Sequence, residues 1–175
     1  LGAYGDAGCM ATNNDELASV LRTIANHGQT AKHNHVMEGR NSRLDGIQAA
    51  ILSAKLPHLN EWTERRRHNA SLYDKFLSGK EVGLPRQKAG YKHVYHLYVI
   101  QVEDRDSVQQ KLRERGVETA IHYPTALPFL PCYKHHQNKV ENFPISHHDQ
   151  SRILSIPMFA ELTEEQIKYV ADKLA

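Results

Sequence analysis

The pattern that most constrains the fold is a strand, a helix, a glycine and a second strand in the later half of the sequence. Residues 93–102 are rich in aromatic and β-branched side chains and alternate in polarity, which is typical of a β-strand. Residues 105–115 have a helical pattern that Gly116 can end, and residues 117–121 predict another strand. This order of elements indicates a compact α/β unit.

The N-terminal region has one further strand pattern and one strong helix pattern. Residues 7–12 are short and apolar between turn residues, so they predict a strand. Residues 13–28 carry leucine, valine and isoleucine at helical spacing. Asn13 or Asn14 can cap the first turn of this helix, and Gly28 can end it in a left-handed conformation.

A polar loop and an interrupted helical stretch follow. Residues 28–43 are polar and aperiodic, and a loop of this length inside a domain is often functional. Residues 44–77 are helical in pattern except at Pro57, which lacks an amide hydrogen and clashes with the preceding turn. We therefore predict a domain boundary near Pro57, which divides the chain into residues 1–56 and 57–175.

The C-terminal third combines an apolar loop with two helical patterns. Residues 122–133 are rich in proline and apolar side chains, which suits the lining of a pocket or an interface. Residues 145–154 predict a helix, and a short extended run follows up to Phe159. The last helix begins at Thr163, and Gln166 stands at the spacing of a capping box.

Composition excludes several classes of function. The net charge is +2, from 22 basic and 20 acidic residues, which argues against a nucleic-acid or membrane-surface partner. No apolar stretch is long enough to span a bilayer. Cys9 and Cys132 form neither a CxxC motif nor a disulfide framework, so we expect a cytoplasmic location. The twelve histidines match no zinc motif, and loop histidines are favoured over a metal-binding module.

Seven segments in register carry a resemblance that covers essentially the whole chain. They are LGAYGDAG, NHGQ, GRNSRLDGIQAAIL, ERRRHNASLYDKFL, HVYHLYVI, IHYPTALPFLPCY and LSIPMFAELTEEQI. In this order they resemble the C-terminal half of the DegT/StrS-type sugar aminotransferases, which are pyridoxal phosphate enzymes of the aspartate aminotransferase fold. The resemblance implies an α/β fold. Residues 1–56 would be a remnant of the large cofactor-binding domain, with a strand, a helix, a dimer-interface loop and a helix. Residues 57–175 would be the small C-terminal domain.

The resemblance also concerns the lysine that binds the cofactor. In this family the stretch before LGAYGDAG typically ends in Lys-Asn, and that lysine forms the internal aldimine with pyridoxal phosphate. It would stand immediately before Leu1, so no catalytic residue is assigned to this chain. Lys32 and Lys55 lie outside that motif and are interpreted as surface lysines. We expect the cofactor to be held by a full-length parent and not by this chain alone.

Two residues of the RNSR segment resemble groups that reach a partner subunit's active site. Asn41 resembles the asparagine that contacts the cofactor phosphate of the partner, and an amide donor suits phosphate oxygens. As an alternative, Asn41 caps the helix that begins near Leu44. Arg43 resembles an arginine that approaches the substrate, where its guanidinium suits a carboxylate or a diphosphate. The alternative for Arg43 is a surface ion pair with Asp45 or Glu38.

Three aromatic residues complete the expected substrate site. His122 and Tyr123 resemble a pair that lies near the sugar or its nucleotide, although both could instead pack under the proline-rich loop. Tyr4 lies in the GAYG turn, where it would contact substrate or fill the turn. The resemblance thus implies Asn41 as a cofactor-binding residue and Arg43, His122, Tyr123 and Tyr4 as substrate-binding residues.

The function that the resemblance implies is transamination of a nucleotide-linked keto sugar. The GAYGDAG form favours a 3-keto over a 4-keto sugar, with glutamate as the amino donor, in the biosynthesis of surface-polysaccharide or antibiotic sugars. A homodimer with shared active sites is expected. The alternative is a non-catalytic binding or interaction fragment, in which apolar faces drive association.

Overall fold

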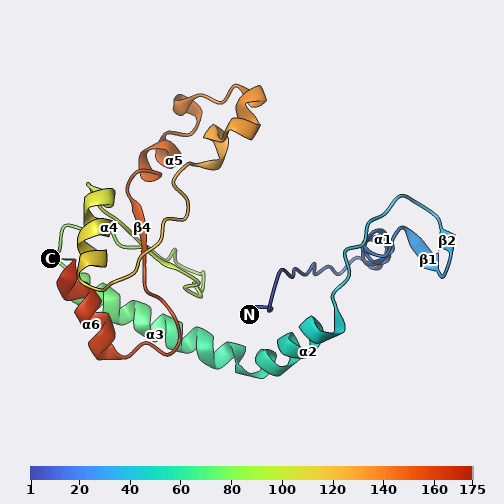
Figure 1. Ribbon diagram of the computed structural model, residues 1–175, viewed down its shortest axis with the longest axis horizontal. Helices are drawn as coiled ribbons and strands as arrows, with labels where there is room; N and C mark the ends of the chain where they lie inside the picture. The colour runs from blue at the N-terminus through green and yellow to red at the C-terminus, as the bar shows by residue number, and fades with distance from the viewer. Residues whose placement is uncertain (175) are drawn as a thin grey trace. The chain divides into compact units, whose positions relative to one another are not determined.

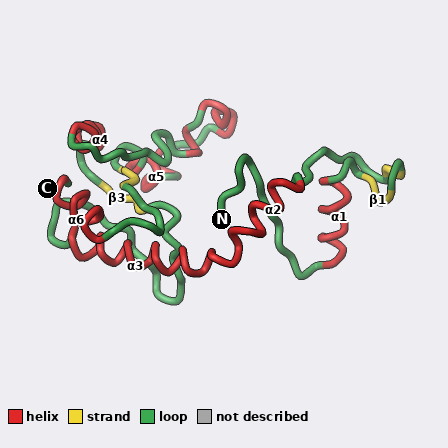
Figure 2. The backbone as a smooth tube through the Cα atoms, turned by 60° about the horizontal axis from the view of Figure 1, so that its bottom comes forward, coloured by secondary structure: helices red, strands yellow, loops and turns green. Residues whose placement is uncertain are grey.

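The computed structural model describes residues 1–174, and the chain divides into two compact units. The first unit comprises Leu1–Leu59 and the second comprises Asn60–Ala175. Figures 1 and 2 show the order of helices and strands within each unit. Both classes of secondary structure occur, so the chain has the mixed α/β character predicted from its sequence. The domain boundary predicted near Pro57 concerns the domains of a parent enzyme and stays a prediction.

Helix α1 (Asp15–Ala25) confirms the helix predicted in the N-terminal region. The Asn14 side chain accepts a hydrogen bond from the Leu17 amide at 2.9 Å, which satisfies one of the amides left unpaired at a helix start. At the other end, the Gly28 amide donates to the Thr23 carbonyl at 2.8 Å, and Gly28 has a φ of +71°. Gly28 therefore helps to close α1, as its sequence position indicated.

The loop predicted over residues 28–43 contains a short hairpin. Strands β1 (Gln29–Ala31) and β2 (Asn34–His35) pair in antiparallel orientation. The polar sequence showed no two-residue periodicity, because most side chains of this hairpin are exposed and no face is buried. The interpretation as a loop without secondary structure was wrong for these two strands.

The strand predicted over residues 7–12 is not formed. These residues have no assigned secondary structure, and all of them are exposed. A strand is stabilised by hydrogen bonds to a neighbouring strand, and no described residue in positions 1–174 pairs with this segment. Apolar composition therefore identified an extended segment but not a strand in this chain.

Pro57 interrupts the long helical stretch where the sequence indicated. Helix α2 (Gly46–Lys55) ends before it, a 3₁₀ turn spans Leu56–His58, and helix α3 (Leu59–Leu77) follows. Helix α2 contributes no buried residue, and its Ile47 side chain is 78% exposed. By contrast, the C-terminal half of α3 carries Asn69, Ala70, Tyr73 and Leu77, all buried.

A small antiparallel sheet organises the second unit. Strand β3 (Tyr98–Gln101) pairs with β4 (Ile153–Ile156). Two isolated bridges extend this sheet, from Gly83 to Gln101 on one side and from Ala120 to Ser155 on the other. The predicted strand over residues 117–121 is thus reduced to the single bridge at Ala120.

The hydrophobic core lies between this sheet and three helices. Helix α4 (Arg105–Glu114) and helix α6 (Glu164–Lys173) join α3 around one face of the sheet. The largest fully buried side chains come from all of these elements: Tyr73, Leu77, Tyr98, Ile100, Leu112, Leu154 and Ile167. Thr163 and Gln166 form the predicted capping box at the start of α6, so that prediction is confirmed.

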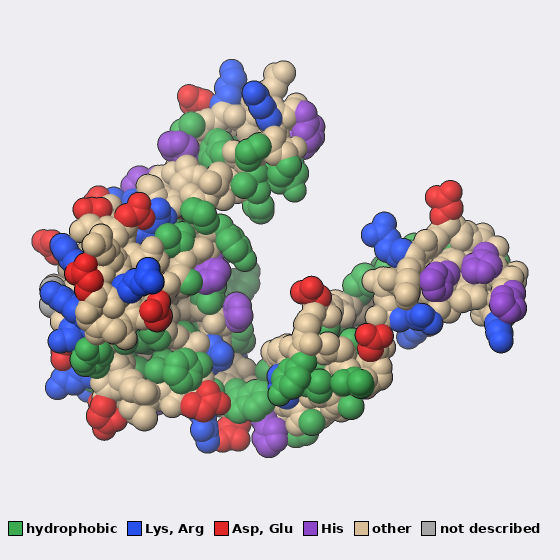
Figure 3. All heavy atoms as spheres, in the orientation of Figure 1, with side chains coloured by type: hydrophobic (Ala, Val, Ile, Leu, Met, Phe, Trp, Pro, Cys, Tyr) green, Lys and Arg blue, Asp and Glu red, His purple; other side chains and the backbone are tan. Residues whose placement is uncertain are grey.

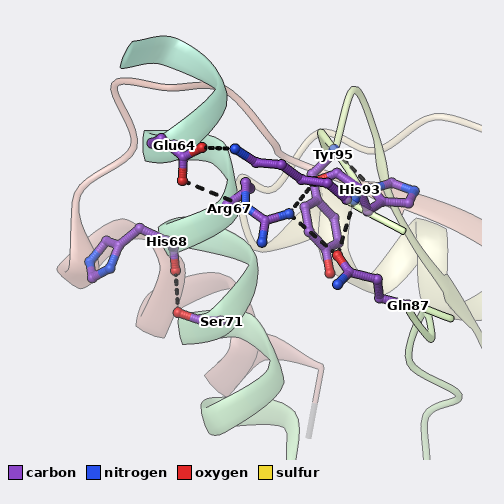
Figure 4. Close-up of polar contacts among 8 residues, drawn as sticks. Glu64, Arg67, His68, Ser71, Gln87, His93 and Tyr95 are labelled. Atoms are coloured by element: carbon purple, nitrogen blue, oxygen red, sulfur yellow. Dashed lines mark hydrogen bonds and ion pairs between the residues drawn. The ribbon is translucent and has the colours of Figure 1, made fainter. Parts of the chain in front are cut away.

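Strand β3 is shorter than the strand predicted over residues 93–102, because arginines of α3 bind the preceding backbone carbonyls. Arg67 Nη1 donates to the His93 carbonyl at 2.7 Å. Arg66 Nη1 donates to the carbonyls of Tyr95 and His96 at 3.1 and 3.2 Å. Figure 4 shows Arg67 beside His93 and Gln87. Guanidinium groups, rather than a neighbouring strand, satisfy these carbonyls.

The segment between Tyr123 and β4 is built from short helical turns. Three 3₁₀ turns span Leu127–Phe129, Pro131–His136 and Val140–Asn142, and helix α5 spans Pro144–Asp149. The helix predicted over residues 145–154 was therefore too long, because its last two residues belong to β4 and are half-buried or buried in the sheet. Within residues 1–174, no helix is long and apolar enough to cross a membrane.

Candidate functional site

A pocket of about 780 Å³ lies beside the face of the β3–β4 sheet that is turned away from the core. Val99 and Ile153 form its floor, and the segment from His122 to Leu130 and helix α5 form its walls. In Figure 3, hydrophobic side chains gather over the lobe around α5, where Leu127 and Ile145 are exposed. An apolar pocket with a few polar groups is the usual form of a small-molecule site.

His122 stands two residues after Ala120, which bridges to β4, and its side chain lines this pocket. Its side chain is half-buried, and its Nδ1 atom lies 2.9 Å from the hydroxyl oxygen of Ser155 on β4. Ser155 is 4% exposed, so this hydrogen bond forms inside the protein. The bond fixes one edge of the imidazole against the sheet.

Tyr123 lies next to His122 at the mouth of the pocket. The centres of the two rings are 5.5 Å apart in an edge-to-face arrangement, and Tyr123 is 70% exposed. The peptide bond that joins the two residues is cis. The structure thus brings the predicted substrate-binding pair together, with an exposed aromatic face and a fixed imidazole at one wall.

Two further hydrogen bonds hold the wall that follows Tyr123. The Gln150 side chain accepts from the Ala126 amide at 2.8 Å, and the Asn138 side chain donates to the Pro128 carbonyl at 2.9 Å. Ser155 and Gln150 were not predicted from the sequence. Ser155 had one available signal, because it is a polar residue inside the apolar run ILSIP.

Asn41 and Arg43 lie in the first unit and contact each other. Arg43 Nε donates to Asn41 Oδ1 at 2.9 Å, and both side chains are exposed. Among the described residues no carboxylate pairs with Arg43, so the proposed ion pairs with Asp45 and Glu38 are not formed. The amide nitrogen of Asn41 and the terminal nitrogens of Arg43 are donors suited to a phosphate or a carboxylate.

Asn41 does not cap helix α2. The N-cap position of that helix is Asp45, which makes no side-chain capping bond. The carbonyls at the end of α1 instead hold the backbone on both sides of Asn41. The Arg40 amide donates to the Ile24 carbonyl at 2.8 Å, and the Ser42 amide donates to the Ala25 carbonyl at 2.9 Å.

Tyr4 is held through its backbone, and its ring is exposed. Its amide donates to the Gln48 side chain at 2.8 Å, and its carbonyl accepts from the same side chain at 2.9 Å. Lys55 Nζ lies 4.6 Å from the centre of the Tyr4 ring and donates to the Gly2 carbonyl at 2.6 Å. Tyr4, Asn41 and Arg43 therefore belong to the first unit, and the His122–Tyr123 pair belongs to the second.

The perturbed carboxyl groups lie outside the pocket. A hydrogen bond from Lys92 lowers the pKa of the exposed Glu64, and a hydrogen bond from Arg152 lowers the pKa of the exposed Glu103. These shifts mark surface ion pairs. Residues 1–174 also contain no group of three histidine, cysteine or acidic side chains that could hold a metal ion.

Comparisons with known proteins agree with this architecture. A "pleiotropic regulatory protein" of Geobacillus stearothermophilus is 44% identical, with 100% of this chain and 48% of the relative covered. A UDP-N-acetyl-3-dehydro-α-D-glucosamine 3-aminotransferase of Acidithiobacillus ferrooxidans is 41% identical, with 98% and 46% covered. The crystal structure of S. venezuelae DesV matches with a TM-score of 0.95 and 35% identity, over 99% of this chain and 47% of that one.

The chain spans about half the length of the curated relatives that it matches. The family model for the DegT/DnrJ/EryC1/StrS aminotransferases matches residues 1–175. The chain is thus similar to members of one protein family over nearly its whole length. The chain belongs to the DegT/DnrJ/EryC1/StrS aminotransferase family.

Proposed function

We propose that this chain is the substrate-binding part of a nucleotide-sugar 3-aminotransferase that uses glutamate as its amino donor. The observation that carries the proposal is the apolar pocket with His122 and Tyr123 at one wall. Such a pocket can hold a sugar ring, since Tyr123 offers an aromatic face and His122 offers a polar nitrogen. The 3-keto preference rests on the GAYGDAG motif and on the 3-aminotransferase name of the A. ferrooxidans relative.

Aminotransferases of this family use pyridoxal 5′-phosphate. The described residues fit one end of that cofactor, since the exposed side-chain amide nitrogen of Asn41 can donate to a phosphate oxygen. The guanidinium of Arg43 beside it has no carboxylate partner in residues 1–174. When bound, the cofactor supplies the electron sink for amino-group transfer. In our proposal Asn41 donates to a phosphate oxygen, and Arg43 binds an anionic group of the substrate.

We assign none of the described residues as the lysine that would bind the cofactor. No lysine lines the pocket beside His122 and Tyr123, and Lys55 already binds the Gly2 carbonyl. We therefore assign no proton transfer to a residue of this chain. In our proposal the chain does not transaminate by itself and contributes binding groups within a longer parent.

We further propose that the parent is a homodimer with shared active sites. Helix α2 has no buried residue, and Leu44, Ile47 and Leu56 at or near it are all exposed. Apolar side chains on one helix without a partner favour association. An interface at α2 would bring the neighbouring Asn41 and Arg43 to a second subunit.

A chimera tests the proposed reaction. The part of the A. ferrooxidans relative that this chain does not match would be fused to Leu1, and release of 2-oxoglutarate from glutamate would be measured. UDP-N-acetyl-3-dehydroglucosamine should be aminated at least tenfold faster than a 4-keto nucleotide sugar. The 175-residue chain alone should give no turnover with the same substrates and pyridoxal phosphate.

Matched variants of the chimera test the assigned residues. Arg43→Ala should raise the KM of the substrate that carries the anionic group, and Asn41→Ala should raise the concentration of pyridoxal phosphate needed for half-maximal activity. Arg22→Ala, on the exposed side of α1, is the control. Equal turnover of 3-keto and 4-keto sugars would contradict the proposed specificity, and turnover by the chain alone would contradict its proposed role.

A further inference from the structure

We propose that Ser155 is a positioning residue that holds His122 with its imidazole proton on Nε2, so that the pocket presents an N–H donor to an uncharged oxygen of the sugar. The inference rests on the proposed binding of a nucleotide sugar at His122. The motif IHYP includes His122 but not Ser155, so the role of the buried hydroxyl is not implied by that motif.

At its buried position, the Ser155 hydroxyl would lower the stability of the fold if it had no hydrogen-bond partner. It stands on β4 between Leu154 and Ile156, and all three residues are buried. Burying a hydroxyl in such surroundings costs free energy unless it forms a hydrogen bond. An alanine or valine would fill the same strand position without that cost. The hydroxyl is therefore best explained by its partner.

Two backbone hydrogen bonds hold Ser155, so the position from which its side chain extends is fixed. Its amide donates to the Ala120 carbonyl at 2.8 Å, and its carbonyl accepts from the Ala120 amide at 3.0 Å. His122 follows Ala120 by two residues. The two bridge bonds thus fix the backbone two residues before His122, and the 2.9 Å contact between Ser155 Oγ and His122 Nδ1 ties the imidazole itself to β4.

The direction of this hydrogen bond follows from the hydroxyl proton. Among the described residues, His122 Nδ1 is the only recorded partner of Ser155 Oγ. If Nδ1 carried a proton, the hydroxyl would accept that bond, and its own buried hydrogen would lack an acceptor. Donation from Ser155 to Nδ1 satisfies both groups. Neutral His122 then carries its proton on Nε2.

The rest of the pocket lining indicates what this donor meets. The described lining contains no lysine or arginine, and it includes the carboxylate of Asp149. A phosphate group would be repelled by that carboxylate without a compensating cation. A keto or hydroxyl oxygen carries no net charge and accepts readily from an imidazole N–H. The pocket is therefore suited to the sugar ring rather than to the diphosphate.

Nitrogen NMR of the 175-residue chain tests the tautomer directly. With ¹⁵N-labelled histidine, the His122 signals are identified by their loss in His122→Gln. We expect a pyridine-like, unprotonated Nδ1 and a pyrrole-like, protonated Nε2 at neutral pH. A protonated Nδ1 in the unmodified chain would overturn the proposal, and this measurement needs no variant of Ser155.

Variants of Ser155 test the cause. Ser155→Ala should abolish the distinct Nδ1 and Nε2 signals in favour of averaged positions, whereas Ser155→Thr keeps the hydroxyl and should restore them. Ser151→Ala is the control, because its hydroxyl binds the His148 carbonyl and not His122. An unchanged tautomer in Ser155→Ala, with an unchanged backbone amide spectrum, would overturn the positioning role.

Two probes separate this inference from the proposed function. UDP-N-acetylglucosamine should move the Nε2–H signal of His122, and inorganic pyrophosphate should not. A response to pyrophosphate alone would overturn the assignment of an uncharged oxygen. A fixed tautomer that depends on Ser155 but responds to neither probe would support the positioning role and count against substrate binding at His122.

Discussion

Arg66 shows how a single side chain can replace a strand as the partner of several carbonyls. Its Nη1 atom donates to the Met158 carbonyl at 2.9 Å as well as to the carbonyls of Tyr95 and His96. Arg66 therefore joins helix α3 to two segments that lie 29 and 92 residues further along the chain. A planar guanidinium suits this task better than an ammonium group.

We expect Arg66→Ala to lower the free energy of unfolding by about 1.5–3 kcal/mol, because hydrogen bonds from a charged donor are lost and carbonyls remain unpaired. Arg65→Ala, at the preceding residue, is the matched control. Arg65 forms only an exposed pair with Glu61, so its loss should cost about 0.5 kcal/mol or less. Chemical denaturation followed by circular dichroism measures both. Equal effects would contradict the role of Arg66.

Two buried tyrosines make stability depend on alkaline pH. Burial raises the pKa of Tyr73, and burial together with the hydrogen bond to Asp74 raises the pKa of Tyr98. Both phenols then stay protonated in the folded chain while they ionise in the unfolded chain above about pH 10. The unfolded state thus binds fewer protons, so stability is full below pH 10 and falls as pH rises.

We expect the free energy of unfolding to decrease above pH 10 with a slope that approaches about 1.4 kcal/mol per pH unit for each tyrosine. Denaturation curves at a series of pH values measure this slope. Tyr98→Phe should lower this slope by about 1.4 kcal/mol per pH unit, and Tyr169→Phe, at an exposed position of α6, is the control. A slope that is the same in Tyr98→Phe as in the unmodified chain would contradict the prediction.

At the scale of elements, the backbone crosses itself in close contact at Gly28 and Gly39, and this crossing positions the segment that carries Asn41. A β-carbon on Gly39 would lie 2.0 Å from the Gly28 nitrogen and 2.6 Å from the His27 carbonyl carbon. Backbone atoms cannot move aside as a flexible side chain can. The two segments can therefore touch only while both positions are glycine.

Gly39→Ala should destabilise this crossing by about 1–3 kcal/mol. Hydrogen exchange of the Arg40 and Ser42 amides, which bind the end of α1, should then accelerate about tenfold or more. Gly46→Ala is the control, because a β-carbon there meets nothing within 4 Å. Slow exchange of both amides in Gly39→Ala would show that the close approach does not hold this segment.

Local signals predicted helices better than strands. The cap at Asn14, the break at Pro57 and the capping box at Thr163 act within a few residues of themselves. A strand forms only when it pairs with another strand, and a local sequence pattern does not indicate which segment that is. Among the described residues, residues 7–12 have no partner strand, and the carbonyls of residues 93, 95 and 96 bind arginines instead. Boundaries of strands were accordingly the weakest part of the prediction.

The residues of the candidate site also fall into two groups: those that a local motif predicts and those that only the folded structure brings together. The motif IHYP identified His122 and Tyr123, and RNSR identified Asn41 and Arg43. Ser155 reaches His122 across 33 residues, and Gln150 reaches Ala126 across 24. No local pattern predicts such contacts, because they depend on how the sheet and its neighbouring loop pack. These contacts become visible only in three dimensions.

At the scale of the whole molecule, burial is concentrated in the second unit. All residues of the hydrophobic core lie in Asn60–Ala175, whereas Thr23 and Gly28 are the only buried residues of the first unit. Stability follows buried apolar area. The first unit thus has little of the burial that protects a backbone from opening.

We expect hydrogen exchange of the unmodified chain to differ strongly between the units. Amides of β3, β4 and the C-terminal half of α3 should exchange at least a hundredfold more slowly than those of α2, because α2 has no buried residue. Mass spectrometry of peptides from the exchanged chain measures the difference. Adding the part of the A. ferrooxidans relative that this chain does not match should slow exchange in α2, and equal protection of both units without it would contradict the prediction.

The two cysteines have a practical consequence. Cys9 and Cys132 are both free and exposed, and one lies in each unit. A fluorescent donor and acceptor can therefore be attached to the unaltered sequence, one on each side of Pro57. Energy transfer between the dyes then reports the separation of the units molecule by molecule, with and without a nucleotide sugar.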